Sequence, residues 1–260
     1  MLKIFTKRES DIYKELKKSK YLSNIKDIES QILSNEPVIK YRYKDFDLFI
    51  NNESAAIFHI VNSVQKIENL ANSVILKDCN IIFDIGANVG LYSYFCNIKY
   101  PDAKYYLFEA DIKLLDVINN NCKNIKYLNV YNLAISNSND KQIKFYINPE
   151  SAQTNSTFKE YLHLFGDVSS EILVETIKLD QFCKDNNIKN IDILKIDIQG
   201  GELDALISGS NILYNTDCLQ LELCFAFNNT LDIISFANKY FKKFEIVNEI
   251  YKGFDINLYK

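Results

Sequence analysis

The residues of this chain that most directly suggest chemistry are two acids, each placed at the end of an apolar run. Asp84 ends the run NIIFD and is followed by Gly86, Asn88 and Gly90, while Glu109 ends the run YYLFE. The glycines do not form the GxGxxG fingerprint of dinucleotide sites, and the sequence has no GxxxxGKS/T phosphate loop. Since an aspartate beside the turn would repel a diphosphate, the pattern favours a ligand that carries a positive charge.

The turn from Asp84 to Gly90 offers groups that suit a small zwitterion. The aspartate can pair with an ammonium, and the N–H groups at the start of the following helix can bind a carboxylate. These two groups together describe an amino acid, and Glu109 is a good acceptor for two ribose hydroxyls. An amino acid joined to a ribose indicates S-adenosylmethionine (SAM). The alternative at this point is a glycine turn with a capping acid and no ligand.

From residue 80 onward, short apolar runs alternate with stretches of helical periodicity. Strands are predicted at 80–85, 104–108, 125–131, 141–147, 174–179, 192–196 and 219–224, with a last antiparallel pair at 244–248 and 255–259. Helices are predicted at 91–99, 112–122, 179–187, 202–206 and 231–240. This alternation predicts an α/β fold with a doubly wound, mostly parallel sheet covered by helices on both faces. The carboxyl ends of such strands meet at one edge, where ligands bind.

A different pattern precedes residue 80. Residues 9–34 have apolar positions at helical spacing, residues 37–50 alternate as a β-hairpin around Lys44 and Asp45, and residues 54–74 are helical again. We therefore expect an N-terminal helix and β-hairpin cap over 1–75, packed on a SAM-binding domain over 76–260.

The composition of the chain argues against several classes of protein and against a metal site. The net charge of −4, without a basic stripe, argues against a nucleic-acid partner. Six cysteines without CxxC spacing and two histidines predict no metal site. The N-terminal residues do not have the pattern of a secretory signal, and no apolar run approaches the ~18 residues of a membrane span. These features predict a cytoplasmic protein with free thiols and no transmembrane segment.

Five segments follow one another in an order and spacing that carry a family resemblance. They are FDIGANVGLYS, YYLFEAD, VYNLAISNSND, ETIKLDQF and DILKIDIQGGELDALISG. Over roughly residues 80–224 the chain resembles the FkbM-family methyltransferases. The resemblance implies the Rossmann-like class I methyltransferase fold, with a seven-stranded sheet whose last strand is antiparallel. It also implies SAM-dependent O-methylation of a hydroxyl, commonly on a sugar, a glycan or a polyketide-like product.

The resemblance also implies which residues bind the cofactor. The methionine-binding loop corresponds to Asp84, Gly86, Asn88 and Gly90, the ribose acid to Glu109, and the turn beside the adenine to Asn132 and Ala134. The chain departs from the family at Ala110, where proline is common. It departs again in the signature Asp-x-Glu-Gly-Ala-Glu, which here runs from Asp197 to Glu202 with Gln199 and Gly201 in place of Glu and Ala.

Methyl transfer to a hydroxyl requires the oxygen to approach the methyl carbon in line at about 3 Å, and a base that removes the hydroxyl proton helps further. Asp197 and Glu202 follow the fourth parallel strand, so we predict that they are catalytic, as base or as substrate orienter. Alternatively, Asp197 binds the SAM ammonium or caps a helix, and Glu202 is a first-turn acid favoured by the helix dipole. Glu222 is a third choice. We expect His59 to be a packed helix residue and His163 to be an exposed loop residue.

The predicted function is that of a SAM-dependent O-methyltransferase acting on a hydroxyl of a sugar, a surface glycan or a related small molecule. The alternatives are a non-catalytic SAM-binding or scaffold protein and a methyltransferase of nucleic acid or protein, although no N/DPPY motif is present. Residues 1–75 and 151–170 are predicted to shape the acceptor pocket, with Tyr161 or Phe165 stacking on a sugar ring. Alternatively, the cap shields the core or mediates a homodimer.

Overall fold

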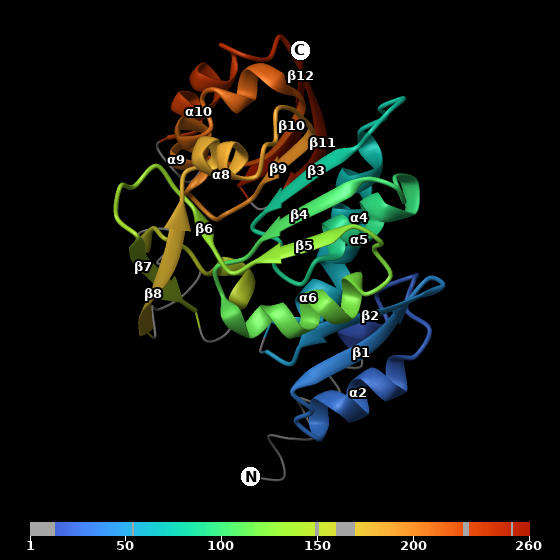
Figure 1. Ribbon diagram of the computed structural model, residues 1–260. Coiled ribbons are helices and arrows are strands. Elements are labelled where there is room, and N and C mark those ends of the chain that lie inside the picture. The colour runs from blue at the N-terminus through green and yellow to red at the C-terminus, as the bar shows by residue number, and fades with distance from the viewer. Residues whose placement is uncertain (1–13, 54, 149–150, 160–169, 226–228, 251) are drawn as a thin grey trace.

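The computed structural model describes residues 14–53, 55–148, 151–159, 170–225, 229–250 and 252–260. A seven-stranded sheet forms its centre, in the order β11-β12-β10-β9-β3-β4-β5 (Figure 1). The strands from β5 through to β10 pair in parallel, whereas β12 runs antiparallel to both of its neighbours. The predicted doubly wound sheet with an antiparallel last strand is confirmed. Its strands are β3 (Ile81–Ile85), β4 (Lys104–Phe108), β5 (Leu128–Tyr131), β9 (Ile191–Ile196), β10 (Thr216–Cys224), β11 (Lys243–Ile250) and β12 (Gly253–Tyr259).

Strand β3 lies where the order of the sheet reverses, because β4 follows it on one side and β9 lies on the other. Ligands of doubly wound sheets bind beyond the carboxyl ends of the strands at such a point. Strand β9, with the sequence IDILKI, is buried at every position, as is typical of a central parallel strand. A charged side chain in a buried strand needs a partner, and Lys195 finds one in the site described below.

Helices cover both faces of the sheet, and each face has its own hydrophobic core. On one face lie α4 (Val64–Ser73), α5 (Leu91–Lys99) and α6 (Leu115–Cys122), the last preceded by a 3₁₀ turn, η2 (Ile112–Leu114). On the other lie α8 (Leu179–Asp185), α9 (Glu202–Ser208) and α10 (Thr230–Ala237), with the 3₁₀ turn η4 (Ile212–Asn215) between α9 and β10. Apart from α4, which is the last part of the helical stretch predicted over 54–74, these helices begin and end within a few residues of the predicted ranges.

The N-terminal part packs on the α4–α6 face and shares its core. It consists of α2 (Ile25–Leu33), a hairpin of β1 (Val38–Tyr43) and β2 (Phe46–Asn51), α3 (Ala56–Phe58), a π-helical turn η1 (His59–Ser63), and α4. Asn121 of α6 fastens the hairpin to the main domain, since it accepts a hydrogen bond from the N–H of Phe49 at 2.8 Å and donates to the carbonyl of Val89 at 2.7 Å. The hairpin therefore lies close to the turn that follows β3.

The helix predicted over 9–34 is interrupted in its described part. Helical structure ends near Leu16 and resumes at Ile25. Between them, Leu22 forms a β-bridge with Tyr43, and the side chain of Asn24 accepts a hydrogen bond from the N–H of Arg42 at 2.8 Å. The apolar residues of this segment have helical spacing. Over the few residues between Leu16 and Ile25, however, pairing with the hairpin replaces the helix.

A second, three-stranded sheet lies on the side of the central sheet toward which β4 and β5 point (Figure 1). It has the order β6-β8-β7, and its strands are β6 (Ala134–Ile135), β7 (Gln142–Ile147) and β8 (Ser170–Ile177). The predicted extra strand at 141–147 is confirmed as β7. A 3₁₀ turn, η3 (Ala152–Thr154), follows it, and Ser156 forms a β-bridge with Tyr146. This bridge holds the segment 151–157 beside the ends of the central strands.

All six cysteines are free thiols, as predicted. None of the helices in the described part of the chain has the length and apolarity that crossing a membrane requires.

Candidate active site

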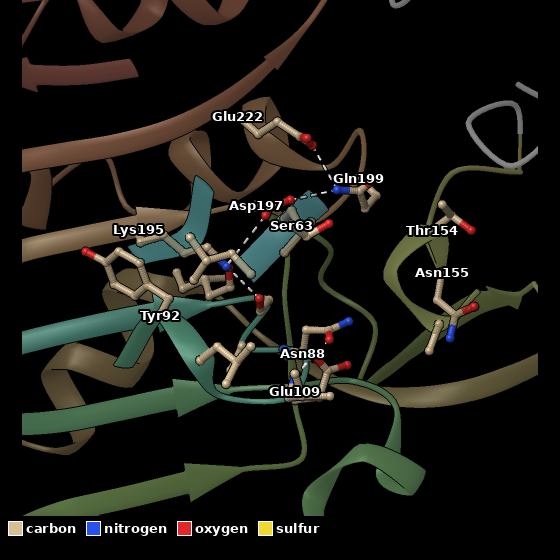
Figure 2. A pocket seen from close by; sticks show the side chains of 18 of the residues that line it. Ser63, Asn88, Tyr92, Glu109, Thr154, Asn155, Lys195, Asp197, Gln199 and Glu222 are labelled. Carbon is tan, nitrogen blue, oxygen red and sulfur yellow. Dashed lines mark hydrogen bonds and ion pairs between the residues drawn. The ribbon is translucent and has the colours of Figure 1, made fainter. Parts of the chain in front are cut away.

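A cavity of about 660 Å³ lies over the carboxyl ends of β3, β4 and β9. Residues that follow these strands form one side of it, and the cap helices and the segment 151–157 form others (Figure 2). Its size falls in the range of ligand pockets, roughly 300–1,000 Å³. The predicted site residues that line it are Gly86, Asn88, Glu109, Ala134 and Asp197.

The turn between β3 and α5 is held tightly against the ends of two other strands. The N–H groups of Gly86 and Ala87 both donate to the carbonyl of Phe108, at 3.0 Å each. Gly86 has a φ of +77°, and a Cβ there would lie 1.9 Å from the carbonyl oxygen of Asp197. Only glycine fits that position without displacing the backbone. Asn88 is also left-handed, with a φ of 51°, a conformation that asparagine tolerates better than most residues.

Glu109 connects this turn to the end of β4. Its Oε2 accepts a hydrogen bond from the N–H of Asn88 at 2.7 Å, and its Oε1 accepts one from the N–H of Asp111 at 2.8 Å. The residue is buried, and burial raises the pKa of its carboxyl to about 7 although both N–H groups act to lower it. Each oxygen retains a lone pair, so a carboxylate on the cavity wall can still accept ligand hydroxyls.

Asp84 lies beneath the cavity rather than in its wall. The side chain is fully buried, accepts a hydrogen bond from Ser93 Oγ at 2.7 Å, and has Lys195 Nζ 3.1 Å from its Oδ1. Lys195 also donates to the carbonyl of Gly86 at 2.6 Å and lies 3.9 Å from Asp197 Oδ2. Burial acts to lower the pKa of Lys195, but the two carboxylates outweigh it and the pKa is raised. An ammonium of the protein thus occupies the place beside Asp84 that we predicted for the ligand's ammonium.

The remaining predicted cofactor residues divide into one that lines the cavity and two that support it. Ala134, at the start of β6, lies in the wall. Asn132 lies behind it, where its Nδ2 donates to the carbonyl of Glu109 at 2.8 Å and fixes the backbone of that residue. Gly90 is a packing position, since a Cβ there would lie 2.8 Å from Cys122 Sγ. Asn132 and Gly90 therefore support the backbone and the packing around the cavity without lining it.

The two predicted catalytic acids are placed differently. Asp197 lines the cavity, and 37% of its side chain is exposed. Glu202 is buried, and its carboxylate accepts hydrogen bonds from the N–H groups of Ile198 and Gly200, both at 3.0 Å. Burial raises the pKa of Glu202 to about 7, against the effect of these N–H groups. Glu202 closes the loop that follows β9 and does not line the cavity, so of the two acids Asp197 alone can face a ligand there.

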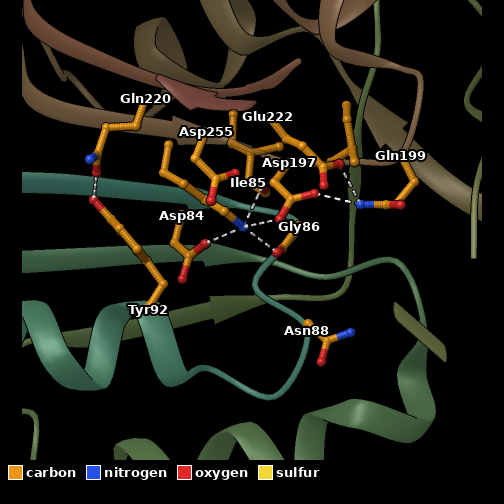
Figure 3. A network of polar contacts seen from close by, with 12 residues as sticks. Asp84, Ile85, Gly86, Asn88, Tyr92, Asp197, Gln199, Gln220, Glu222 and Asp255 are labelled. Carbon is orange, nitrogen blue, oxygen red and sulfur yellow. Dashed lines mark hydrogen bonds and ion pairs between the residues drawn. The ribbon is translucent and has the colours of Figure 1, made fainter. Parts of the chain in front are cut away.

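Further acids surround Asp197 (Figure 3). Glu222 of β10 and Asp255 of β12 also line the cavity, and they lie directly opposite each other in the antiparallel pairing. The side-chain amide of Gln199 donates to Asp197 Oδ1 at 2.7 Å and to Glu222 Oε2 at 2.8 Å. Burial, with Asp197 and Asp255 nearby, raises the pKa of Glu222 well above its ordinary value, and burial raises the pKa of Asp255 to about 6.

His59 belongs to the part of the wall formed by the cap. It lies in the π-helical turn η1, with Nδ1 3.3 Å from Ser63 Oγ and Nε2 3.2 Å from Ser151 Oγ. All three residues line the cavity. Burial lowers the pKa of His59 to about 4, so the imidazole is neutral at neutral pH. The prediction of a packed helix residue is correct, but it missed that this residue also faces the cavity and joins the cap to the segment 151–157.

The predicted roles of His163, Tyr161 and Phe165 concern positions outside the described residues. Among the residues that the structure describes, no group of three or more His, Cys, Asp or Glu side chains is arranged to hold a metal ion.

Comparison with known proteins decides the family. Residues 84–244 match the family model of the methyltransferase FkbM domain, which is more than half of the chain. The chain belongs to the FkbM methyltransferase family. It is a methyltransferase, and SAM is its cofactor, as predicted from the sequence.

Relatives of this FkbM methyltransferase include one curated protein, the 2-O-methyltransferase NoeI of Sinorhizobium fredii. The two are 26% identical over 170 residues, which cover 60% of this chain and 68% of that protein. Among solved structures, TYW2 of M. jannaschii in complex with AdoMet has a TM-score of 0.49 at 8% identity, over 86% of this chain and 84% of that one. Precorrin-6y C5,15-methyltransferase of Geobacter metallireducens has a TM-score of 0.45 at 11% identity, over 77% and 89%.

The residues of this FkbM methyltransferase fit a bound SAM molecule. The buried carboxyl of Glu109 faces the cavity with acceptor capacity for ribose hydroxyls, and the turn at Gly86 allows close approach of backbone. The start of α5 borders the cavity through Leu91 and Tyr92, and a helix N-terminus suits a carboxylate. The acceptor oxygens of Glu109 therefore suit the ribose hydroxyls, and the N–H groups at the start of α5 suit the carboxylate of the cofactor.

Proposed function

We propose that this methyltransferase transfers the methyl group of SAM to a hydroxyl of a sugar, a surface glycan or a related small molecule. The observation that carries the proposal is the composition of the cavity over the ends of β3, β4 and β9. One side offers a buried carboxyl and a glycine turn, and the others offer hydroxyl, amide and imidazole groups together with exposed Phe58. The similarity to a 2-O-methyltransferase supports transfer to oxygen.

In this proposal the cofactor is held by residues that follow β3, β4 and β5. Glu109 accepts the ribose hydroxyls, Gly86 and Asn88 form the wall beside the amino-acid portion, and Ala134 contacts the adenine. Asp84 contributes indirectly, because its pairing with Lys195 fixes the carbonyl of Gly86. SAM supplies a methyl group on a positively charged sulfur, which makes it transferable.

The chain's own residues would orient the acceptor and take up its proton. Asp197 is exposed to the cavity, and the backbone of this residue touches the turn at Gly86. A base in that position accepts the hydroxyl proton as the new O–C bond forms, which contributes roughly 10²–10⁴-fold to the rate. Glu202 would hold the loop in which Asp197 lies.

The acceptor would lie against the cap and the segment 151–157. Ala152 N–H donates to Glu53 at 2.7 Å and Asn155 donates to Asp111 at 3.1 Å, so this segment is tied to both the cap and the main domain. Phe58 borders the cavity with 62% of its surface exposed, and an exposed aromatic ring can stack on the apolar face of a sugar. Loops and added elements on a rigid scaffold are where specificity usually resides.

The proposal is tested by incubating purified protein with SAM labelled in the methyl group and with candidate acceptors. The acceptors are glycans and small hydroxylated molecules on one hand, and RNA, DNA and protein on the other. Label on a hydroxyl of the first group, lost by about 10²-fold or more in Asp197→Asn, supports the proposal. Label only on nucleic acid or protein contradicts the acceptor class, and SAM binding without transfer to any acceptor favours a non-catalytic role.

A further inference from the structure

The side chain of Gln199 lies between two acids of the cavity wall. Its amide nitrogen donates to Asp197 Oδ1 at 2.7 Å and to Glu222 Oε2 at 2.8 Å (Figure 3). Both N–H bonds of the amide are therefore directed at carboxyl groups from different strands. The backbone of Gln199 is left-handed, with a φ of 59°, and its carbonyl accepts a hydrogen bond from Ser156 Oγ at 2.6 Å. Left-handed backbone is uncommon for a residue other than glycine. Here the hydrogen bond from Ser156, which lies outside the loop, stabilises this conformation, and the conformation directs the Gln199 side chain toward the two acids.

The charged groups around this pair come from every neighbouring element. Lys195 of β9 lies 3.9 Å from Asp197 Oδ2, and Asp255 of β12 lies opposite Glu222. Glu202 of α9 acts electrostatically on Glu222, and Lys66 of α4 acts on Asp255. Negative groups thus outnumber positive ones, and two adjacent carboxyls in such a place do not both ionise readily.

The two members of the pair differ in their surroundings. Asp197 is partly exposed to the cavity, and its Oδ2 lies 3.9 Å from the Lys195 ammonium. Glu222 is half-buried and lies opposite Asp255, and desolvation followed by the nearby charges of Asp197 and Asp255 raises its pKa well above the ordinary value. The two carboxyls therefore face opposite charges, an ammonium beside Asp197 and another carboxyl beside Glu222.

We propose that Gln199 is a positioning residue that holds Asp197 and Glu222 as an unlike pair, in which ionised Asp197 takes the acceptor's proton while Glu222 remains protonated. This inference rests on the proposed transfer to a hydroxyl. In the step, the acceptor oxygen forms a bond to the methyl carbon, the S–C bond breaks and its electrons neutralise the sulfonium, and the hydroxyl proton passes to Asp197. An amide suits position 199 because it donates to both acids, whereas a glutamate there would add a third negative charge.

The test compares Gln199→Leu, which removes both donors, with Gln199→Glu, which replaces the amide by a carboxyl of the same shape. Gln181→Leu is the matched control, since Gln181 lies on the outer side of α8 and bonds only with neighbouring Asp185 among the contacts described. Calorimetry with SAM first confirms that each variant folds and binds the cofactor within about twofold of wild type. Single-turnover methyl transfer is then measured from about pH 4 to pH 9, so that the titration range of an ordinary carboxyl is included.

We expect the acidic limb of the rate profile to move to higher pH by about one unit in Gln199→Leu and further in Gln199→Glu. Gln181→Leu should match wild type. A profile that keeps its position in both Gln199 variants overturns the proposal, because a merely structural loss lowers the rate without moving the limb.

A second readout does not depend on transfer. The carboxyl carbon of Glu222, labelled with ¹³C and assigned with Glu222→Gln, should report a protonated group at pH 7 in the wild-type protein with SAM bound. An ionised Glu222 there overturns the proposal. If wild type methylates no hydroxyl acceptor, the proposed function fails, while this measurement still decides the state of the pair.

Discussion

Lys195 and Asp84 form an ion pair beneath the cavity, with 3.1 Å between Nζ and Oδ1 and with 7% and 0% of their side chains exposed. A buried pair of this kind gains little over apolar residues, but the removal of one partner leaves a charge without compensation. The pair also fixes the carbonyl of Gly86, to which Lys195 donates. We therefore expect the Lys195 ammonium to affect both the stability of the protein and the binding of the cofactor.

We predict that Lys195→Met lowers the free energy of unfolding by about 3–5 kcal/mol, because Asp84 then remains buried without its partner. Urea unfolding followed by circular dichroism measures the change. In the double variant Lys195→Met with Asp84→Asn, part of this loss should return, since the uncompensated charge is gone. Lys144→Met removes an exposed pair with Glu171 and should cost no more than about 1 kcal/mol. Equal losses for the buried and exposed lysines would contradict the prediction.

Glu109→Gln should weaken SAM binding by about tenfold or more, since hydrogen bonds to a charged acceptor contribute roughly 1.5–3 kcal/mol. Calorimetry at pH 8 measures the affinity, with Glu171→Gln of the outer sheet as the control. A glutamine has the same shape as a glutamate, but it accepts hydrogen bonds more weakly and at one oxygen only. Unchanged affinity would remove Glu109 from the ribose site.

The affinity of wild type for SAM should also fall as the pH is lowered from 8 to 6. The pKa of Glu109 in the free protein is about 7 because of burial, and the ionised form is the better acceptor for hydroxyls. Below this pH, binding must first remove a proton, which costs up to tenfold in affinity per pH unit. Glu109→Gln should show a flatter dependence over the same range, and an equally steep one would assign the effect to another group.

The free protein should lose stability as the pH rises from about 5 to 7. Burial raises the pKa of Glu109 and of Glu202 to about 7 and that of Asp255 to about 6. Between the ordinary carboxyl pKa and these values, the folded state binds more protons than the unfolded chain, so a rise in pH favours unfolding. His59 acts in the opposite direction, because its pKa is lowered to about 4, but it is one group against at least four, since the pKa of Glu222 is also raised by burial. Urea midpoints at pH 5 and pH 7 test the sign.

Much of the fold could be predicted because its strands and helices differ in periodicity and alternate regularly. The order of the parallel strands follows from that alternation, and it brings the ends of β3 and β4 together. The proximity of Glu109 to the turn at Gly86 and Asn88 was thus accessible from the sequence. The interruption before Ile25 was not, because the bridge between Leu22 and Tyr43 depends on tertiary packing.

The polar contacts inside the site were harder to predict, because an acid's partner can lie far away in the chain. Asp84 has the right type and position for a ligand's ammonium, but Lys195 of β9 reaches it first. The one available signal was the isolated lysine in the apolar run DILKID. Likewise, Glu202 follows Asp197 closely in the sequence, yet it turns back to the N–H groups of its own loop. Spacing alone does not distinguish these orientations.

The cap wall provides the last prediction, which concerns His59. Its two ring nitrogens lie 3.3 Å from Ser63 Oγ and 3.2 Å from Ser151 Oγ, all on the cavity wall. A π-helical turn inside a helix is a frequent feature of functional sites, and this one places the His59 ring between Ser63 of the turn and Ser151 of the segment 151–157. If this wall binds the acceptor, His59→Phe should leave the affinity for SAM within about twofold and lower kcat/KM for the acceptor by about tenfold, the value of roughly one hydrogen bond of 1.4 kcal/mol.

Gln65→Ala, on the exposed side of α4, is the control for this wall and should leave both quantities unchanged. The variant Ser151→Ala removes the contact between His59 and Ser151 but leaves the imidazole ring in place. If His59 acts through this contact, Ser151→Ala should lower kcat/KM by a factor similar to that of His59→Phe. The double variant His59→Phe with Ser151→Ala should then lose little more than either single variant. Because the imidazole is neutral above its pKa of about 4, the effect of His59→Phe should be the same at pH 6 and pH 8. A loss of SAM binding in His59→Phe would show that this wall serves the cofactor or the fold instead of the acceptor.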